Sequence, residues 1–308
     1  MSVTTNSLTT GPGPGVAGLA SARTCSAGPA TGRRISVRRS EILPAAMHHL
    51  GRMAWSHHDG LRRDAAESES LELVHTFTTA EICDDVMVAA LDELIGADVL
   101  HGQWEFEEAA VGLIRSSSAR SGDAWAAFYD NSLRSLRDGT ASFAPVHRRA
   151  RSLISGSSVL EVGCCFGLFA LQCAETGLTV SACDISAGAI DLLTAAADRR
   201  DTPLRAVVGD ATALRFVDDS VDTVTLIHLL EHLGAEQART AITEALRVAR
   251  RAVVIAVPYE EHPSEHFGHR VTLDALDLQR WSEEVDHAGA EIFTDRGGWL
   301  ILTPGPPS

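Results

Sequence analysis

Residues 151–308 alternate between short apolar stretches and amphipathic segments of about 10–15 residues. Strands are expected at Ser158–Gly163, Thr179–Asp184, Leu204–Gly209, Thr223–His228 and Ala252–Pro258. Strands that alternate with helices in this way form βαβ units and a parallel sheet. Near the end of the chain, Asp295-Arg296-Gly297-Gly298 is a turn signal between Ala290–Thr294 and Trp299–Leu302, which are expected to pair as a hairpin. The pattern predicts an α/β fold with a mostly parallel sheet and a terminal antiparallel hairpin.

A turn that contains glycine follows the first of these strands, in the stretch VLEVGCCFG from Val159 to Gly167. The strand is expected to end at Gly163, and a helix to begin near Phe166. Ligands of open α/β sheets bind outside the carboxyl ends of the strands, against a helix N-terminus. Gly163 has no Cβ, so the backbone there can approach a ligand closely. The turn is therefore predicted to form part of a ligand site.

Three acidic residues narrow the class of ligand. Glu161 lies on the first strand, Asp184 closes the second and Asp210 follows the third in the stretch GDAT. A dinucleotide fingerprint needs Gly-x-Gly-x-x-Gly, whereas this turn has only Gly-x-x-x-Gly. A carboxylate on the first strand cannot stabilise a negatively charged pyrophosphate. It can pair with the positive charge of a zwitterionic ligand. A nucleotide-binding α/β domain of another kind is the alternative.

These motifs resemble the class I S-adenosylmethionine-dependent methyltransferases, from Leu153 to the end of the chain. The resemblance rests on VLEVGCCFG, the two aspartates and VDTVTLIHLLEHL from Val221. It implies a Rossmann-like three-layer sandwich that binds S-adenosylmethionine. Gly163 and Gly167 would form the loop on the methionine side with support from Glu161; Asp184 and Ile185 would hold the ribose, and Asp210 and Ala211 the adenine edge. Cys165, which stands where the family has its middle glycine, would belong to the same loop.

A second set of motifs resembles the mycofactocin oligosaccharide methyltransferases, over residues 40–305. These motifs are DAWAAFYDNSL from Asp123, FAPV from Phe143, GCCFG, CDISAG from Cys183, HLLEHL, AVPYE and GGWL from Gly297. The resemblance implies O-methylation of a sugar hydroxyl on the oligosaccharide chain of glycosylated mycofactocin, a peptide-derived redox cofactor. A methyltransferase of the same fold acting on a small aromatic or lipid acceptor, and a cofactor-binding protein without catalysis, are the alternatives.

A sugar hydroxyl is a poor nucleophile at neutral pH, so its methylation needs a general base or a metal. His228, Glu231 and His232 follow the fourth strand at a spacing that places them on one helical face. His228 is the favoured base because strand ends line the ligand crevice, and His232 is a further candidate. No metal ligand is assigned, although a divalent cation held by this cluster and a purely structural role are open alternatives.

A second group of histidines follows the fifth strand, in EEHPSEHFGH from Glu260. Loops at this edge commonly carry substrate contacts, and His266 and His269 are the candidate catalytic residues within it. A solvated polar loop is the alternative. Trp125, Tyr129 and Trp299 are candidates for stacking on sugar rings, although packing in the core is the favoured role for each.

The chain divides into three zones. Residues 1–35 are rich in small residues and are predicted to form a disordered tail without the apolar stretch of a signal peptide. Residues 36–150 are expected to form a mainly helical cap that helps select the acceptor. Its expected elements are helices at Asp84–Ile95, Phe106–Ser116 and Asp123–Leu136, the last ended by Gly139, and a strand at Leu71–Thr78. Residues 151–308 form the predicted S-adenosylmethionine-binding domain.

Composition excludes several classes of protein. The formal net charge of −15 argues against binding of nucleic acid, which needs clustered cations. All 26 basic residues are arginine, so a Schiff-base lysine and a P-loop lysine are impossible. No apolar run reaches the roughly 18 residues of a membrane span. The 6 cysteines lack metal-site spacing and suit a reducing compartment, so a cytoplasmic protein that binds neither nucleic acid nor membrane is expected.

Overall fold

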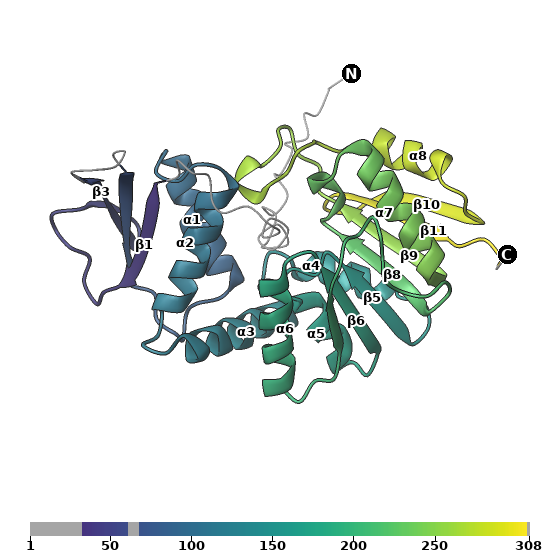
Figure 1. Ribbon diagram of the computed structural model, residues 1–308, viewed down its shortest axis with the longest axis horizontal. Coiled ribbons are helices and arrows are strands. Elements are labelled where there is room, and N and C mark those ends of the chain that lie inside the picture. The colour runs from purple at the N-terminus through teal and green to yellow at the C-terminus, as the bar shows by residue number, and fades with distance from the viewer. Residues whose placement is uncertain (1–32, 61–67, 307–308) are drawn as a thin grey trace, which may run out of the picture.

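The computed structural model describes residues 33–60 and 68–306, which form two sheets with helices around them (Figure 1). The larger sheet has 7 strands in the order β10-β11-β9-β8-β5-β6-β7. These strands are β5 (Ser158–Val162), β6 (Thr179–Asp184), β7 (Arg205–Val208), β8 (Val221–Ile227), β9 (Ala249–Val257), β10 (Gly289–Thr294) and β11 (Gly298–Thr303). All pairs are parallel except β11 with β9 and with β10. The predicted α/β class and terminal hairpin are confirmed.

Helices cover both faces of this sheet, because successive side chains of a strand point to opposite faces. On β5, Leu160 and Val162 pack into the core beneath α7 (Ala235–Val248) and α8 (Ala275–Glu284). Val159 packs into the core on the other face, which is covered by α4 (Ala144–Leu153), α5 (Leu168–Glu175) and α6 (Ala187–Arg199). The result is the predicted Rossmann-like three-layer sandwich. No helix in the described part of the chain is both long and apolar enough to cross a bilayer.

The register of the parallel strands brings the predicted site to one edge of the sheet. Val162 at the end of β5 lies opposite Cys183 of β6 and Leu226 of β8. Asp184 lies opposite Val208 of β7 in the same way. The segments that follow these four strands therefore leave the sheet side by side, and they carry the residues predicted to bind the cofactor and to act as the base.

The N-terminal zone differs from the mainly helical cap that was predicted, because it also contains a four-stranded sheet. Its strands are β1 (Arg34–Arg39), β2 (His48–Leu50), β3 (Met53–Gly60) and β4 (Ser68–His75), in the order β1-β4-β3-β2. Only β4 was expected, as the segment Leu71–Thr78. The others escaped prediction because one face of each is polar and exposed, as in RISVRR of β1. The predicted tail lies outside the described residues up to residue 32, and β1 begins at Arg34.

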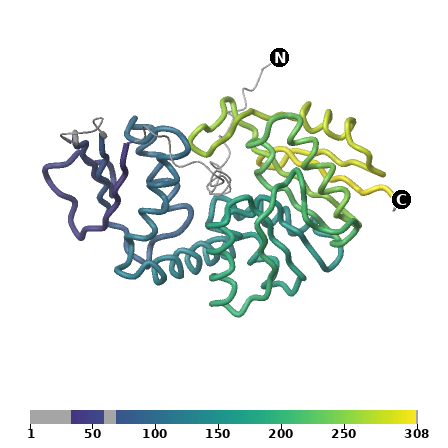
Figure 2. Tube along the Cα trace, viewed as in Figure 1, coloured from purple at the N-terminus to yellow at the C-terminus, as the bar shows by residue number. Residues whose placement is uncertain are grey.

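Three helices follow this small sheet, at α1 (Asp84–Gly96), α2 (Gly102–Ser116) and α3 (Ser121–Asp138), close to the predicted ranges. Helix α2 packs directly on β1, where a Cβ on Gly112 would lie 2.5 Å from Val37 Cγ2. Helix α3 ends at Gly139, whose φ of 76° confirms the predicted stop. Figure 2 shows α3 running from the small sheet towards the large one.

Helix α3 connects the N-terminal zone to the glycine-containing loop. The Tyr129 hydroxyl donates a hydrogen bond to the Phe166 carbonyl at 2.9 Å. The ring of Phe166 packs against Trp125 and Phe128 of the same helix. Asp130 pairs with Arg200, beside the end of α6, at 2.6 Å. The N-terminal zone is therefore held against the edge of the sheet where the predicted site lies.

Replacing Tyr129 with phenylalanine is expected to lower the free energy of unfolding by about 1–3 kcal/mol, because the buried Phe166 carbonyl loses its donor. Urea denaturation measures this difference. Tyr259, which is 37% exposed, provides the control: its hydroxyl contacts Thr294 near the surface, where water can replace that contact, so Tyr259→Phe should change stability by less than about 1 kcal/mol. Equal stabilities of the two variants would show that the hydrogen bond of the Tyr129 hydroxyl does not stabilise the contact between α3 and the loop.

Candidate active site at the carboxyl ends of the strands

The loop between β5 and α5 has a left-handed backbone at three positions. Gly163, Cys165 and Gly167 have φ values of 74°, 50° and 68°. A Cβ on Gly167 would lie 2.4 Å from Leu193 Cδ1, and one on Gly163 would lie 2.8 Å from Leu229 Cδ1, so both positions need glycine. Cys165 adopts a conformation that costs a non-glycine residue roughly 1–2 kcal/mol. A hydrogen bond that the Cys165 N–H donates to Asp184 offsets this cost.

That hydrogen bond joins Cys165 to Asp184. The Cys165 N–H donates to Asp184 Oδ2 at 2.8 Å, and the Ser186 N–H donates to Oδ1 at 2.8 Å. Asp184 is buried, and burial raises its pKa although these hydrogen bonds oppose the rise. The Ile185 backbone also contributes a hydrogen bond, and because a carboxylate has about four acceptor positions, Asp184 retains capacity for a ligand hydroxyl. Asp184 thus shapes the loop and keeps acceptor capacity at the end of β6.

Glu161 is a buried carboxyl group with an unused oxygen. It accepts a hydrogen bond from the Ala170 backbone, but no described residue donates to its Oε2. Burial raises the pKa of Glu161 well above its ordinary value. An unpaired buried carboxylate is costly, and a cationic ligand group would relieve that cost. This is the observation in the structure that fits the ammonium group of S-adenosylmethionine.

A pocket that is partly open to solvent lies beside Glu161, which is one of its lining residues. The glycine-containing loop forms one wall, and the N-terminal zone forms the other. Its lining includes Phe143 and His147 at the start of α4, Ile227 of β8 and Asp84 of α1. His147 Nδ1 lies 2.9 Å from Gln172 Oε1, and burial lowers the pKa of His147 to about 4, so the ring is neutral. Sequence reasoning missed Phe143 and His147 as pocket residues, although FAPV was singled out as a motif.

The residues predicted for the adenine side lie at the neighbouring strand ends. Asp210 is exposed after β7, and its Oδ1 accepts hydrogen bonds from the backbone and hydroxyl of Thr212 at 2.8 and 2.7 Å. Ala211 and Ile185 are half-buried. The Gly209 N–H donates to the Asp184 carbonyl at 2.9 Å, which joins this segment to β6. The structure thus brings all the predicted cofactor residues to one edge, and their contact with the cofactor stays a prediction.

His228 stands between the pocket and a group of buried polar residues. It follows β8 with a φ of 52° and packs against the Phe143 ring, with 4.9 Å between ring centroids. Its Nδ1 lies 3.3 Å from Glu231 Oε1. His228 itself does not line the pocket, but its chain neighbour Ile227 and its ring partner Phe143 do, so it lies next to the pocket.

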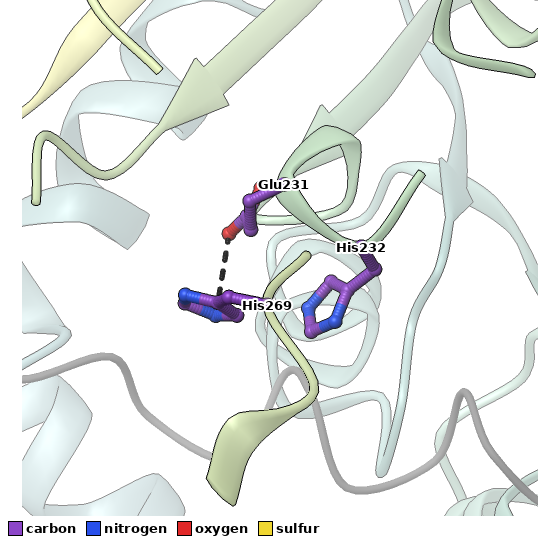
Figure 3. Close-up of side chains that lie close together, drawn as sticks. All are labelled: Glu231, His232 and His269. Atoms are coloured by element: carbon purple, nitrogen blue, oxygen red, sulfur yellow. Dashed lines mark ion pairs between the residues drawn. The ribbon is translucent and has the colours of Figure 1, made fainter. Parts of the chain in front are cut away.

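Glu231, His232 and His269 come together beyond His228 (Figure 3). Glu231 and His232 lie on the short 3-10 helix η2 (Leu230–His232), and His269 comes from the loop after β9. Burial alone would raise the pKa of Glu231. The neighbouring histidines lower it by more, so its pKa lies below the ordinary value. Burial lowers the pKa of His232. The structure therefore joins parts of the two histidine groups that the sequence analysis treated separately.

His266 lies elsewhere. Its Nε2 is 3.3 Å from Asp92 Oδ1 of α1, and its ring packs against Phe106 and Phe267. The loop after β9 is held against α1 and α2 by these contacts. His266 therefore serves in the structure as a contact between this loop and the N-terminal helices, and not as a member of the buried group.

The aromatic candidates for sugar stacking are buried. Trp125, Tyr129 and Trp299 have exposed fractions of 8%, 2% and 1%. Trp299 stacks on Phe293 within the hairpin, and its indole N–H donates to the Asp295 carbonyl. These contacts fit the favoured alternative, in which all three pack in the core.

Comparison with known families gives one domain match. Residues 160–257 match a family described as "Methyltransferase domain". This stretch contains the glycine loop, both aspartates at the strand ends and His228, but not the N-terminal zone or the terminal hairpin. Residues 160–257 are therefore similar to methyltransferase domains, which agrees with the predicted fold class and supports S-adenosylmethionine as the cofactor.

Two curated relatives are named demethylmenaquinone methyltransferase. The one from Renibacterium salmoninarum is 32% identical over 111 residues, which are 36% of this chain and 44% of the relative. The one from Beutenbergia cavernae is 36% identical over 95 residues, 31% of this chain and 37% of the relative. The chain thus matches less than half the length of either relative.

Among solved structures, a protein of Pyrococcus horikoshii is 18% identical, with a TM-score of 0.45, over 55% of this chain and 91% of that one. Magnesium protoporphyrin IX methyltransferase from Synechocystis, solved with bound S-adenosylmethionine, is 18% identical, with a TM-score of 0.41, over 58% of this chain and 84% of that one.

Proposed function

We propose that this protein is an S-adenosylmethionine-dependent O-methyltransferase that acts on a sugar hydroxyl in the oligosaccharide chain of glycosylated mycofactocin. The observation that carries the cofactor part is the buried Glu161, whose Oε2 no described residue contacts by a hydrogen bond. It lies beside the glycine-containing loop, and both line the pocket. When bound, the cofactor supplies a methyl group on a positively charged sulfur.

The residues of this chain have distinct tasks in the proposed reaction. Glu161 holds the positively charged methionine end, and Asp184 holds the ribose while it fixes the loop through Cys165. The N-terminal zone closes the other side of the pocket and limits the access of water. His228, at the border of the pocket, accepts the proton of the acceptor hydroxyl.

The proposed acceptor rests on motifs outside the cofactor loop. Phe143, from the stretch FAPV, lines the pocket and contacts His228. The stretch DAWAAFYDNSL lies on α3, which packs against the loop. Both motifs support the resemblance to the mycofactocin oligosaccharide methyltransferases. They lie at the pocket or beside it, where an acceptor would enter.

A second candidate acceptor is an aromatic lipid. The names of the two curated relatives favour it, since both are demethylmenaquinone methyltransferases. Several lining residues, among them Leu136, Phe143 and Phe166, are apolar, as such an acceptor requires. The matches, however, cover less than half of each relative, so they support the methyltransferase domain more than the choice of acceptor.

Parallel assays of the full chain separate the two candidates. The protein is incubated with S-adenosylmethionine and either glycosylated mycofactocin or demethylmenaquinone, and product masses are measured. One added methyl group on the glycan is the expected result. Methylation of the quinone alone would replace the proposed acceptor with the second candidate, and methylation of neither, with cofactor binding intact, would overturn both acceptors.

Glu161→Gln is expected to weaken S-adenosylmethionine binding roughly tenfold, because one charged hydrogen bond contributes about 1.5–3 kcal/mol. Burial raises the pKa of Glu161, so part of the free protein carries a proton there, whereas the cationic ligand favours the carboxylate. Binding should therefore release a proton, and affinity should rise as the pH rises through the raised pKa. Calorimetry in buffers of different ionisation enthalpy measures the release. Equal proton release by the wild type and Glu161→Gln would remove Glu161 from the site.

A further inference from the structure

The buried group next to His228 contains three side chains that could hold a metal ion, and two of them, Glu231 and His232, have buried polar atoms without a hydrogen-bond partner among the described residues. Glu231, His232 and His269 are 1%, 6% and 5% exposed. One candidate ligand atom from each lies within 4.8 Å of the other two. Figure 3 shows the three side chains close together. No residue in the described ranges donates a well-aligned hydrogen bond to either carboxylate oxygen of Glu231 or to His232 Nε2, and the nearest group to Glu231 Oε1 is His228 Nδ1 at 3.3 Å. Such groups rarely stay buried without a partner, so a ligand is indicated.

The hydrogen bonds of the two imidazoles point the same nitrogen of each ring into the group. His269 Nδ1 lies 2.7 Å from Glu260 Oε2, and His232 Nδ1 lies 3.2 Å from the Gly268 carbonyl. Carboxylate and carbonyl oxygens accept hydrogen bonds, so each Nδ1 carries the proton. In a neutral ring the lone pair then lies on Nε2. His269 Nε2 is 3.9 Å from Glu231 Oε1, too far for a hydrogen bond.

This arrangement is the one found around protein-bound metal ions. A metal-binding histidine usually donates its other ring N–H to a carboxylate or backbone carbonyl. Glu260 is itself fixed, because its Oε1 accepts a hydrogen bond from Ser264 Oγ at 2.7 Å. Two imidazoles and one carboxylate are a known ligand set of catalytic zinc, which keeps a further coordination position open.

We propose that Glu231, His232 and His269 bind a divalent transition-metal ion of the zinc class. Nitrogen ligands disfavour Mg²⁺ and Ca²⁺, which prefer oxygen. Binding would bring the three ligand atoms from their present separation, within 4.8 Å of one another, to roughly 2.0–2.2 Å from one ion. Glu260 is a positioning residue that orients His269.

The role of the ion rests on the proposed function. His228 separates this group from the cofactor pocket and lies 3.3 Å from Glu231 Oε1. An ion with an open position there would bind the acceptor hydroxyl and lower its pKa, so that its proton passes to a base more readily. Of two adjacent sugar hydroxyls, one would bind the ion through its oxygen and the other would face the pocket.

Metal binding is tested on the full chain without reference to activity. The protein is treated with a chelator, dialysed and titrated with Zn²⁺ or Co²⁺, using calorimetry and the visible absorption of bound Co²⁺. The wild type should bind one equivalent more than Glu231→Gln. Glu260→Gln, which keeps all three ligands, should bind with roughly 10–100-fold lower affinity. His262→Ala, an exposed histidine of the same loop, should bind like the wild type.

The outcomes separate this proposal from the proposed function. Binding that is lost in Glu231→Gln supports the metal site even if no sugar is methylated. Identical titrations of the wild type and Glu231→Gln, with circular dichroism showing both folded, would overturn it and leave an ion pair between His269 and Glu231. If Glu231→Gln does not fold, unchanged affinity in Glu260→Gln would overturn it in the same way. Competition by Mg²⁺ at equal concentration would contradict the zinc class.

Discussion

His228→Ala is expected to lower turnover by about 10²–10⁴-fold, while the affinity for S-adenosylmethionine stays within a factor of two or so. The reason is the position of the side chain. It borders the pocket through Phe143, at 4.9 Å between ring centroids, and is not among the residues around Glu161 and the loop. Initial rates with the methyl acceptor measure turnover, and calorimetry measures cofactor affinity.

The control for this variant is His262→Ala, which removes an exposed histidine from the loop after β9. Its turnover should equal that of the wild type. Wild-type turnover of His228→Ala would assign His228 a structural role, packing against Phe143. A parallel loss of cofactor affinity would show that His228 acts through the shape of the pocket instead of as the base.

Asp184→Ala is expected to weaken S-adenosylmethionine binding roughly 100-fold or more. The substitution removes the proposed acceptor of the ribose hydroxyls, and each hydrogen bond to a charged group contributes about 1.5–3 kcal/mol. It also removes the acceptor of two buried N–H groups, those of Cys165 and Ser186. The loop around Cys165 then loses the contact that holds its left-handed backbone. Calorimetry with the full chain measures the affinity.

Two further variants make this result interpretable. Asp191→Ala removes an exposed aspartate from the adjacent helix α6 and should bind like the wild type. Asp184→Asn keeps one acceptor oxygen and should lie between the wild type and the alanine variant. If Asp184→Ala is folded and binds with unchanged affinity, the assignment of Asp184 to the cofactor site is wrong.

The central part of the seven-stranded sheet was predictable because strands such as β8 and β9 are buried on both faces. Apolar runs such as Ala252–Val257 of β9 then stand out between amphipathic helices. The hairpin was predictable for a different reason, since Gly297 and Gly298 mark its turn. The residues at the strand ends followed from the topology, because parallel strands bring their carboxyl ends to one edge.

The small N-terminal sheet was not predictable from the same signals. Strand β1 has alternating burial, but arginines occupy most of its exposed positions, and β2 has only 3 residues. Such strands are stabilised by contacts with distant parts of the chain, here the packing of Val37 against Gly112 of α2. Local pattern carries little of that information.

The histidines show the same limit at the candidate site. Sequence spacing related His228 to His232, and His266 to His269, but it could not relate one pair to the other. The loop after β9 folds back so that His269 meets Glu231, whereas His266 meets Asp92 of α1. A contact between segments so far apart in the sequence is a property of the tertiary structure. The pocket residue His147 was missed for a similar reason, since its environment comes from α4, α5 and the loop together.

The most direct test of this account is a crystal structure of the full chain with S-adenosylhomocysteine. We predict that the amino group of the ligand contacts Glu161, that its ribose hydroxyls contact Asp184, and that its sulfur faces Phe143 and His228. A ligand bound away from the carboxyl ends of β5 and β6, with Glu161 uncontacted, would contradict the account.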